Sequence, residues 1–438
     1  MTVTGLTGAY LMKILWITNI IMSEFNEYLF GKRRNDLWMG AMLGQLRNGS
    51  DEYIVVTSGK TRKTKTYVSG NIKYLLIPGG VPARYKAEKQ DVAVWTQLLA
   101  TEKPDVIHIW GTEFKPGLAA LIAAEGSIPS IIYIQGILDA IARYYEAGMT
   151  RREILKNVTF RDIIKRDNII QQKKSLERRA AGEREMLLRC HAVISENIWC
   201  DSHIKALASE VRIFRMPLPL GKAFRAGTWR QEQTEPYSLI CNATGFTYKG
   251  LHIIMRAVKI LKQKYPQIKL YIPGEFHHSK ASLQWKLRRS GYTKFIEGLA
   301  EELEIAGNLV WLGYTDQQTL ADTMRTKQVF ILGSSVENHS SSLKEAMLLG
   351  MPCVASDVGG IAAYLRHGEN GMLYRVEDYE LLAEYVCKYF EDEEFCRRIS
   401  ERATADIARL SGASEAVSPV LDIYKTLISE SRQGRGNA

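Results

Sequence analysis

The chain has 438 residues, 46 % hydrophobic and 24 % charged, with a formal net charge of +10. This length is too great for one compact core and predicts two domains, while the composition excludes disordered, collagen-like and disulfide-stapled proteins. The positive charge favours anionic partners such as phosphorylated substrates, lipid head groups or nucleic acid.

The segment before the first predicted strand, residues 13–18, has neither the basic start nor the apolar stretch of a cleavable secretory signal. No apolar run further along the chain reaches the roughly 18 residues of a membrane span. The six cysteines are scattered, without a CxxC pair or a grouping with histidine that would hold zinc, and are expected to be reduced thiols. We therefore expect a cytoplasmic protein.

Short runs rich in Ile and Val alternate with longer helical patterns over the first half of the chain. This alternation is typical of a parallel sheet covered by helices on both faces. The predicted strands span residues 13–18, 53–57, 72–77, 105–110, 130–134 and 192–195. We assign residues 12–220 to a first doubly wound, Rossmann-like α/β domain.

A basic stretch precedes the last of these strands and contains Arg151, Arg152, Lys156, Arg161, Lys165, Arg166, Lys173, Lys174, Arg178, Arg179, Arg184 and Arg189. Acidic residues are interleaved with these cations, so one interpretation is a solvated helical face. The other is a surface that attaches peripherally to anionic lipids at the inner membrane face. Nucleic acid is not expected as a partner, because no recognition motif accompanies the charge.

A segment rich in Pro, Gly and polar residues, near residues 216–236, predicts the domain linker. After it come predicted strands at residues 237–243, 269–274, 308–313, 328–333 and 352–356, and we assign residues 236–410 to a second domain of the same kind. Residues 411–438 have a helical pattern and are expected to return to the first domain. Ligands of such sheets bind at the carboxyl ends of the strands, so two facing domains predict a ligand cleft.

Residues 334–360 carry the most informative pattern, SSVENHSSSLKEAMLLGMPCVASDVGG. Glu337 lies in the loop after a strand, and Glu345 lies in the following helix, with Ser340, Ser341 and Ser342 between them. Free amides at the start of a helix can bind a diphosphate, while the two carboxylates accept hydrogen bonds from sugar hydroxyls. The alternatives are a solvated loop acid for Glu337 and a capping box for Glu345, with Ser342 as its N-cap.

The sequence resembles the retaining glycosyltransferases of family 4, which have the two-domain GT-B fold. The marker of that family is a pair of Glu residues separated by seven positions and followed by Ala-Met and Gly-x-Pro. This chain matches it with Glu337, Glu345, Ala346, Met347, Gly350, Pro352, Val358, Gly359 and Gly360. The resemblance runs from Met12 onward, is strongest over residues 237–375, and implies two doubly wound Rossmann-like domains facing across a cleft.

In that family the first Glu contacts the donor sugar and the second contacts the ribose, roles that the resemblance carries over to Glu337 and Glu345. A Lys-Gly pair, whose lysine neutralises the donor phosphates, matches Lys249 and Gly250. Where the family commonly has an arginine, five residues earlier, this chain has Thr244. The implied catalytic residues are Lys249 and Glu337, and the implied donor-binding residues are Thr244, Gly245, Lys249, Gly274, Glu337, Asn338, His339, Ser340, Ser341, Ser342 and Glu345.

The resemblance places Asn19, Gly111, Glu113 and Gln135 on the acceptor side of the cleft. Many members carry a histidine where this chain has Gln135, which can donate a hydrogen bond but cannot act as a base at neutral pH. His108 lies inside a predicted strand and is expected to pack in the core.

The resemblance implies transfer of a sugar from a UDP- or GDP-linked donor to a glycan or lipid-linked acceptor, with retained anomeric configuration, in surface polysaccharide synthesis. No DxD-type motif stands where a metal-dependent transferase needs one, so no cofactor and no metal are expected. Two alternatives remain. One is a phosphorylase or epimerase on the same fold, and the other is a non-catalytic nucleotide-sugar-binding protein, which Thr244 and Gln135 favour.

Overall fold

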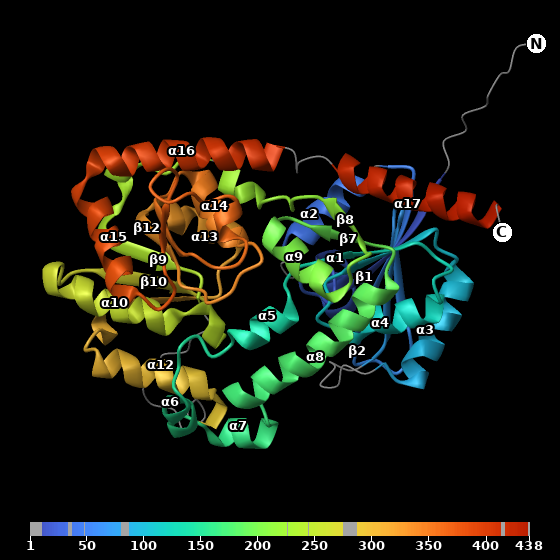
Figure 1. Ribbon diagram of the computed structural model, residues 1–438, viewed down its shortest axis with the longest axis horizontal. Helices are drawn as coiled ribbons and strands as arrows, with labels where there is room; N and C mark the ends of the chain where they lie inside the picture. Colours follow the sequence, from blue (N-terminus) through green and yellow to red (C-terminus); the bar gives the residue numbers. More distant parts are fainter. Residues whose placement is uncertain are drawn as a thin grey trace, which may run out of the picture.

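The computed structural model describes residues 11–33, 37–47, 49–79, 87–225, 227–243, 245–274, 287–412 and 417–436. Figure 1 shows two α/β domains side by side, with strands β1 to β8 in the first domain and β9 to β14 in the second. Each domain has its own sheet, so the carboxyl ends of two sets of strands are available to form a site between them.

Within the described residues, the sheet of the first domain has eight strands in the order β3-β4-β2-β1-β5-β6-β7-β8. They are β1 (Lys13–Thr18), β2 (Glu52–Gly59), β3 (Lys65–Ser69), β4 (Ile72–Pro78), β5 (Val106–Trp110), β6 (Ser130–Tyr133), β7 (Ala192–Ser195) and β8 (Arg212–Arg215). Neighbouring strands are parallel except β3 and β4. The sequence did not predict β3 and β8, because both are edge strands with exposed ends and no continuous apolar run.

The described part of the second domain contains a six-stranded parallel sheet in the order β11-β10-β9-β12-β13-β14. Its strands are β9 (Glu235–Cys241), β10 (Lys269–Pro273), β11 (Leu309–Gly313), β12 (Lys327–Leu332), β13 (Cys353–Ser356) and β14 (Met372–Tyr374). The sequence predicted all of these except β14, whose three residues are too few to produce a recognisable pattern.

Helices cover both sheets. In the first half of the chain the helices are α1 (Ser23–Phe30), α2 (Leu37–Leu46), α3 (Lys89–Glu102), α4 (Lys115–Ala124), α5 (Leu138–Arg143), α6 (Arg151–Lys156), α7 (Phe160–Lys165), α8 (Ile169–Arg189) and α9 (Ile198–Leu207), of which α6 contacts the second domain. The later helices are α10 (Leu251–Lys264), α12 (Gly291–Glu302), α13 (Gln317–Arg325), α14 (Ser341–Leu349), α15 (Tyr379–Glu391), α16 (Glu393–Gly412) and α17 (Ser418–Gly436). Among the described residues, none of them is long and apolar enough to cross a bilayer.

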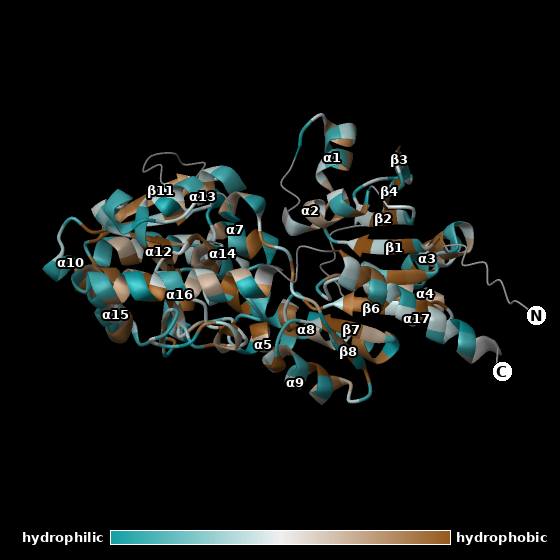
Figure 2. Ribbon diagram, turned by 90° about the horizontal axis from the view of Figure 1, so that it is seen from above, coloured by the Kyte–Doolittle hydropathy of each residue, from teal (hydrophilic) through white to brown (hydrophobic). Residues whose placement is uncertain are grey.

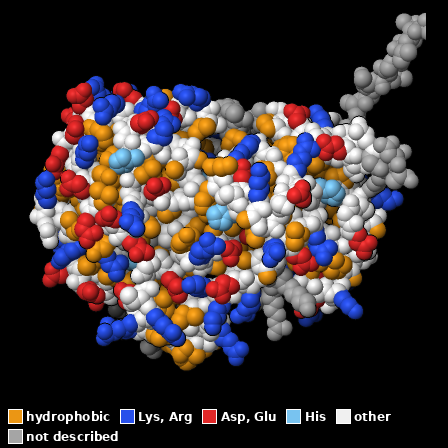
Figure 3. Space-filling model, in the orientation of Figure 1, with side chains coloured by type: hydrophobic (Ala, Val, Ile, Leu, Met, Phe, Trp, Pro, Cys, Tyr) orange, Lys and Arg blue, Asp and Glu red, His pale blue; other side chains and the backbone are white. Residues whose placement is uncertain are grey.

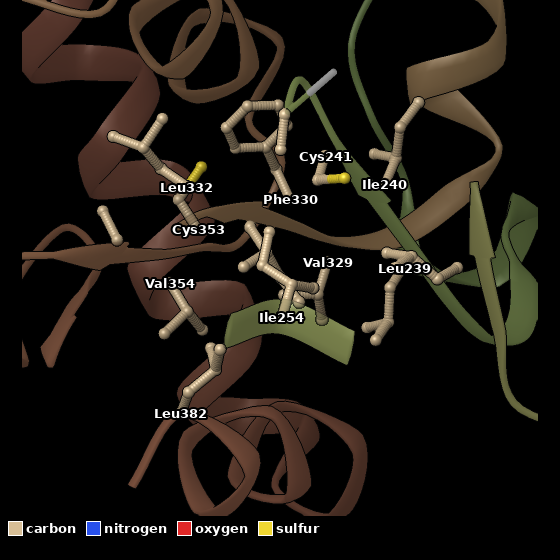
Figure 4. Packing of buried hydrophobic residues seen from close by; sticks show 14 of the residues in the cluster. Leu239, Ile240, Cys241, Ile254, Val329, Phe330, Leu332, Cys353, Val354 and Leu382 are labelled. Atoms are coloured by element: carbon tan, nitrogen blue, oxygen red, sulfur yellow. The ribbon is translucent and has the colours of Figure 1, made fainter. Parts of the chain in front are cut away.

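The core lies between each sheet and its helices. Figure 2 shows brown strands inside the molecule and teal on the outer helices. In the second domain, Leu239, Val329 and Val354 from three neighbouring strands pack with Ile254 of α10 and Leu382 of α15 (Figure 4). These side chains are buried because helices cover both faces of a parallel sheet, which explains the nearly continuous apolar runs of the strands.

The last helix, α17, packs against the first domain, whereas α16 lies on the second (Figure 1). The buried hydroxyl of Tyr424 accepts a 3.0 Å hydrogen bond from Nε1 of Trp16 and forms another with Nδ1 of His108. His108 is fully buried, as the sequence predicted, and burial lowers the pKa of its imidazole. The C-terminal helix therefore joins the central strands of the first sheet.

The predicted linker is attached to the second domain over part of its length. The backbone N–H of Trp229 donates to the carbonyl of Leu349 at 2.8 Å, and its indole Nε1 donates to the carbonyl of Lys327 at 2.7 Å. The side chain is buried. One buried aromatic residue produces no periodic apolar pattern, so the sequence did not indicate that this part of the linker packs on the second domain.

Candidate functional site

Lys249 is positioned by a tight turn between β9 and α10. Gly250, which follows it, has a φ of +70°, and a Cβ atom there would lie 1.8 Å from the carbonyl oxygen of Gly333. Only glycine fits this conformation and this contact. The turn therefore brings Lys249 against the loop that follows β12. Gly245 lies earlier in the same connection, and Thr244 lies outside the described residues.

Glu337 is the direct partner of Lys249. The ammonium Nζ lies 2.6 Å from Glu337 Oε1, and the same oxygen accepts a 2.7 Å hydrogen bond from the hydroxyl of Ser334. Burial lowers the pKa of Lys249, but the neighbouring Glu337 carboxylate outweighs this effect, so the pKa lies above its ordinary value. The two residues predicted as catalytic thus form a largely buried ion pair from different loops.

The backbone of Glu337 is held by a Gly-Gly turn. The N–H of Gly360 donates to the carbonyl of Glu337 at 3.0 Å. Gly359 has a φ of +56°, and a Cβ there would lie 1.8 Å from the same carbonyl oxygen. The glycines of the sequence motif are therefore explained by this close approach of two backbones.

Helix α14 begins at Ser341, four residues after Glu337. Ser340 is its N-cap, and the hydroxyl of Ser340 accepts a 3.3 Å hydrogen bond from the N–H of Leu343. The first N–H groups of a helix have no acceptor within it, so the amides of Ser341 and Ser342 can receive an anion. The capping-box alternative for Glu345 is wrong, because the N-cap is Ser340 and the matching position is occupied by Leu343.

Glu345 instead faces the segment that joins the two domains. Its Oε1 lies 3.4 Å from the N–H of Gly221, a long hydrogen bond. Burial raises the pKa of Glu345 to about 7, and that weak hydrogen bond opposes the shift only in part. A carboxylate with so few partners of its own has room to accept hydrogen bonds from a ligand.

Two of the predicted donor-binding side chains point toward the first domain. Asn338 donates from Nδ2 to the carbonyl of Ile134 at 2.9 Å, and the Nδ2 of Asn197 donates to the carbonyl of Asn338 at 2.8 Å. His339 directs its Nε2 to Glu196, 3.1 Å away. Both side chains are therefore occupied by contacts between the domains.

Glu196, which the sequence analysis missed, is the centre of this connection. It lies directly after β7, and its side chain is 3 % exposed. Its carboxylate meets the ammonium of Lys344 at 2.6 Å and accepts a hydrogen bond from Tyr133. Burial raises the pKa of Glu196, but His339 and Lys344 outweigh it, so the carboxyl has a lowered pKa. The sequence could have indicated Glu196, because it directly follows a predicted strand and ligands of such sheets bind at the carboxyl ends of the strands.

The residues predicted on the acceptor side divide between two hollows. Asn19 and Gly111 line a small pocket of about 70 Å³ at the ends of β1 and β5. Glu113 lines a larger groove of about 1240 Å³, open to solvent, between α7, α8 and the loop that contains Gly245. The side chain of Gln135 reaches the carbonyl of Trp110 at 3.4 Å.

Glu113 has an unusual environment in this groove. Its Oε2 is buried and, within the described part of the chain, has no hydrogen-bond partner. Burial raises the pKa of the Glu113 carboxyl. A hydrogen bond from its own backbone amide and the charge of Arg179 lower the pKa, but they only partly offset the effect of burial. A buried oxygen of this kind is ready to bind a hydroxyl group of a ligand.

The remaining predicted residue, Gly274, directly follows β10 and donates from its N–H to the carbonyl of Gly313 at 2.8 Å. The structure thus unites Lys249, Glu337 and the start of α14, places Glu345 one helical turn further along, and leaves Gly274 at a strand end. No group of three or more His, Cys, Asp or Glu side chains arranged as metal ligands occurs among the described residues.

Comparison with known proteins relates this chain to a protein family. Residues 229–406 match the family model "Glycosyl transferases group 1". A similar protein is the N-acetyl-alpha-D-glucosaminyl L-malate synthase of Bacillus anthracis, with 29 % identity over 137 residues. That match spans 31 % of this chain and only 35 % of the length of the relative.

Solved structures resemble the chain over nearly its whole length. Sucrose-phosphate synthase from Thermosynechococcus elongatus has a TM-score of 0.69 at 14 % identity and covers 96 % of this chain and 100 % of its own. HepE from Anabaena, solved in complex with UDP-glucose, has a TM-score of 0.63 at 14 % identity and covers 94 % and 99 %. The chain therefore carries a glycosyltransferase group 1 domain in residues 229–406, within the two-domain GT-B fold.

Proposed function

We propose that this protein is a retaining glycosyltransferase that moves a sugar from a UDP- or GDP-linked donor to a glycan or lipid-linked acceptor in the synthesis of a polysaccharide. The proposal rests chiefly on the 2.6 Å pair of Lys249 and Glu337 beside the start of α14. A cation and free helix amides can bind the diphosphate of a nucleotide sugar. A carboxylate can accept hydrogen bonds from its sugar hydroxyls. The complex of HepE with UDP-glucose supports the donor class.

Lys249 and the amides of Ser341 and Ser342 would stabilise the charge that develops on the leaving diphosphate. Electrostatic stabilisation of this kind is commonly the largest single contribution to enzymatic rate enhancement. Glu337 would exchange its bond with Lys249 for hydroxyls of the donor sugar, and Glu345 would accept hydrogen bonds from the ribose hydroxyls. Donor binding would thus replace the ion pair of Lys249 with Glu337 by two contacts with the ligand. Lys249 would contact the diphosphate, and Glu337 would accept hydrogen bonds from sugar hydroxyls.

In the transfer step, the bond between the anomeric carbon and the diphosphate oxygen breaks, and the acceptor oxygen forms a bond to that carbon from the same face. The acceptor hydroxyl gives its proton to the departing diphosphate oxygen, so no protein base is required. We propose that Glu113 orients the acceptor hydroxyl, which the buried Oε2 of its carboxyl, unpartnered within the described residues, supports. Since Lys249 supplies a positive charge, we propose that the reaction requires no metal ion.

A screen with labelled nucleotide sugars and product analysis tests the proposal. A new glycoside with retained configuration supports it, whereas a sugar phosphate or an isomerised donor indicates a phosphorylase or an epimerase. Donor binding without turnover indicates a non-catalytic binding protein. The variant Lys249→Ala should reduce turnover by about a hundred-fold or more. The matched control is Lys259→Ala on α10, whose ion pair with Glu304 is exposed and whose loss should leave turnover unchanged.

A further inference from the structure

The short helices α6 and α7 expose four large apolar side chains. Leu155 is 53 % exposed, Phe160 62 %, Ile163 64 % and Ile164 66 %. We call these four residues the docking surface. Figure 3 shows orange side chains gathered at the lower edge of the molecule over α7, with blue Lys and Arg side chains beside them. Adjacent exposed apolar groups, unlike isolated ones, mark interaction sites.

The backbone that carries the docking surface is firmly held. Capping boxes begin both helices, at Thr150 for α6 and at Thr159 for α7. The hydroxyl of Thr159 donates to the carbonyl of Arg289 at 3.1 Å, and Lys294 of α12 donates to the carbonyl of Lys156 at 3.0 Å. The exposed apolar side chains therefore belong to a segment anchored to the second domain, with its polar groups bonded inward.

Five exposed cations accompany the docking surface along the same segment, namely Arg151, Arg152, Lys156, Lys165 and Arg166. The described residues provide none of these five with an ion-pair partner. The two acids of the segment are already neutralised, since Glu153 pairs with Arg256 at 3.5 Å and Asp162 pairs with Arg161 at 3.0 Å. The charges of this segment that have no ion-pair partner in the described part of the chain are therefore all positive.

We propose that α6 and α7 dock this protein on an anionic lipid bilayer. Apolar side chains that enter the interface and cations that meet acidic head groups are the two contributions that hold a peripheral protein on a membrane. The choice of a bilayer over a protein partner rests on this charge complementarity around an apolar centre.

Docking through α6 and α7 would also bring the groove that contains Glu113 close to the bilayer. Lys165, the last residue of α7, and Arg166, which follows it, line that groove together with Glu113. If the proposed function holds, a lipid-linked acceptor with an anionic head group would reach the groove from the bilayer along these cations. This corollary rests on the proposed function, whereas the docking itself does not.

Vesicle flotation of the full chain tests the docking, with phosphatidylcholine alone and with phosphatidylcholine mixed with phosphatidylglycerol. We expect binding to the anionic vesicles that weakens with added salt. The double variant Ile163→Ser, Ile164→Ser should lower the partition coefficient roughly ten-fold or more, and Arg151→Gln, Arg152→Gln should lower it mainly at low salt. The control Ile198→Ser alters a side chain that is 73 % exposed on α9 and should bind like the parent.

Equal binding of all variants, or no binding to anionic vesicles, would overturn the proposal. A dimer that forms in solution and is lost in Ile163→Ser, Ile164→Ser would assign the surface to a second copy of the chain instead. Turnover of donor with a water-soluble acceptor, measured without vesicles, should be unchanged in that variant. A parent protein that floats but transfers no sugar would contradict the proposed function while leaving the docking intact.

Discussion

Glu196 at the end of β7 and Lys344 in α14 form a 2.6 Å ion pair that joins the two domains. Both side chains are largely buried, with 3 % and 14 % of their surfaces exposed. Lys344 lies in the helix whose first amides we assign to the donor diphosphate. The contact therefore links the relative position of the domains to the proposed donor site.

Replacing Glu196 with glutamine should destabilise the protein. The variant leaves the buried Lys344 without its carboxylate, and breaking a buried pair in this way costs about 3 kcal/mol or more. Chemical denaturation measures the difference. The control is Glu304→Gln, whose side chain is 78 % exposed and whose loss should change the free energy of unfolding by about 0.5 kcal/mol at most. Equal effects of the two variants would show that the interdomain pair contributes nothing specific.

Donor binding should depend on pH through Glu345. The folded pKa of this group is raised to about 7, so its carboxylate forms as the pH rises through that value. The ionised group accepts hydroxyl hydrogen bonds more strongly, and donor affinity should increase over this range. The linked stability has the opposite sign: ionising a buried group whose pKa is raised should destabilise the free protein as pH rises from the ordinary Glu value through about 7.

Calorimetric titration with an intact nucleotide sugar at several pH values measures this effect, since the diphosphate diester itself does not titrate near neutrality. The variant Glu345→Gln should bind the donor with little dependence on pH. A pH dependence that persists unchanged in this variant would exclude Glu345 as its source.

The two glycines Gly250 and Gly298 should respond in opposite ways to alanine. At Gly250 the new Cβ would meet the carbonyl oxygen of Gly333 in a left-handed conformation, and the cost should exceed about 1 kcal/mol. At Gly298, within α12, a Cβ has no atom within 4 Å, and alanine should stabilise the helix by about 0.5 to 1 kcal/mol. Thermal unfolding compares them, and a stable Gly250→Ala protein would contradict the packing described for this turn.

Turnover should survive treatment with a chelator, because the proposed charge stabilisation comes from Lys249 and helix amides. The assay compares the protein before and after EDTA, followed by dialysis. A loss of activity that Mg²⁺ or Mn²⁺ restores would contradict the proposed metal-independent mechanism.

The sequence predicted the buried strands well because helices cover them on both sides. Residues 13–18 and 328–333 each contain four consecutive apolar residues, at 14–17 and 329–332, and the two runs coincide with β1 and β12 to within one residue. Edge strands such as β3 and β8 were missed, because their partly exposed side chains include polar residues that interrupt any such run. The spacing of Glu337 and Glu345 was equally visible, since a loop followed by a helix is a local feature.

What the amino-acid sequence determined by itself was local: the order of strands and helices, the glycines that permit tight turns, and the motif of residues 334–360. The tertiary structure alone decided which side chains meet. It paired Lys249 with Glu337 across 88 positions, turned Asn338 and His339 toward the first domain, and brought Glu196 to Lys344 across 148 positions. The physical reason is that an ion pair depends on the distance between two side chains in space. Residues far apart in the sequence that meet only in the folded protein produce no periodic pattern by which the sequence would reveal the pair.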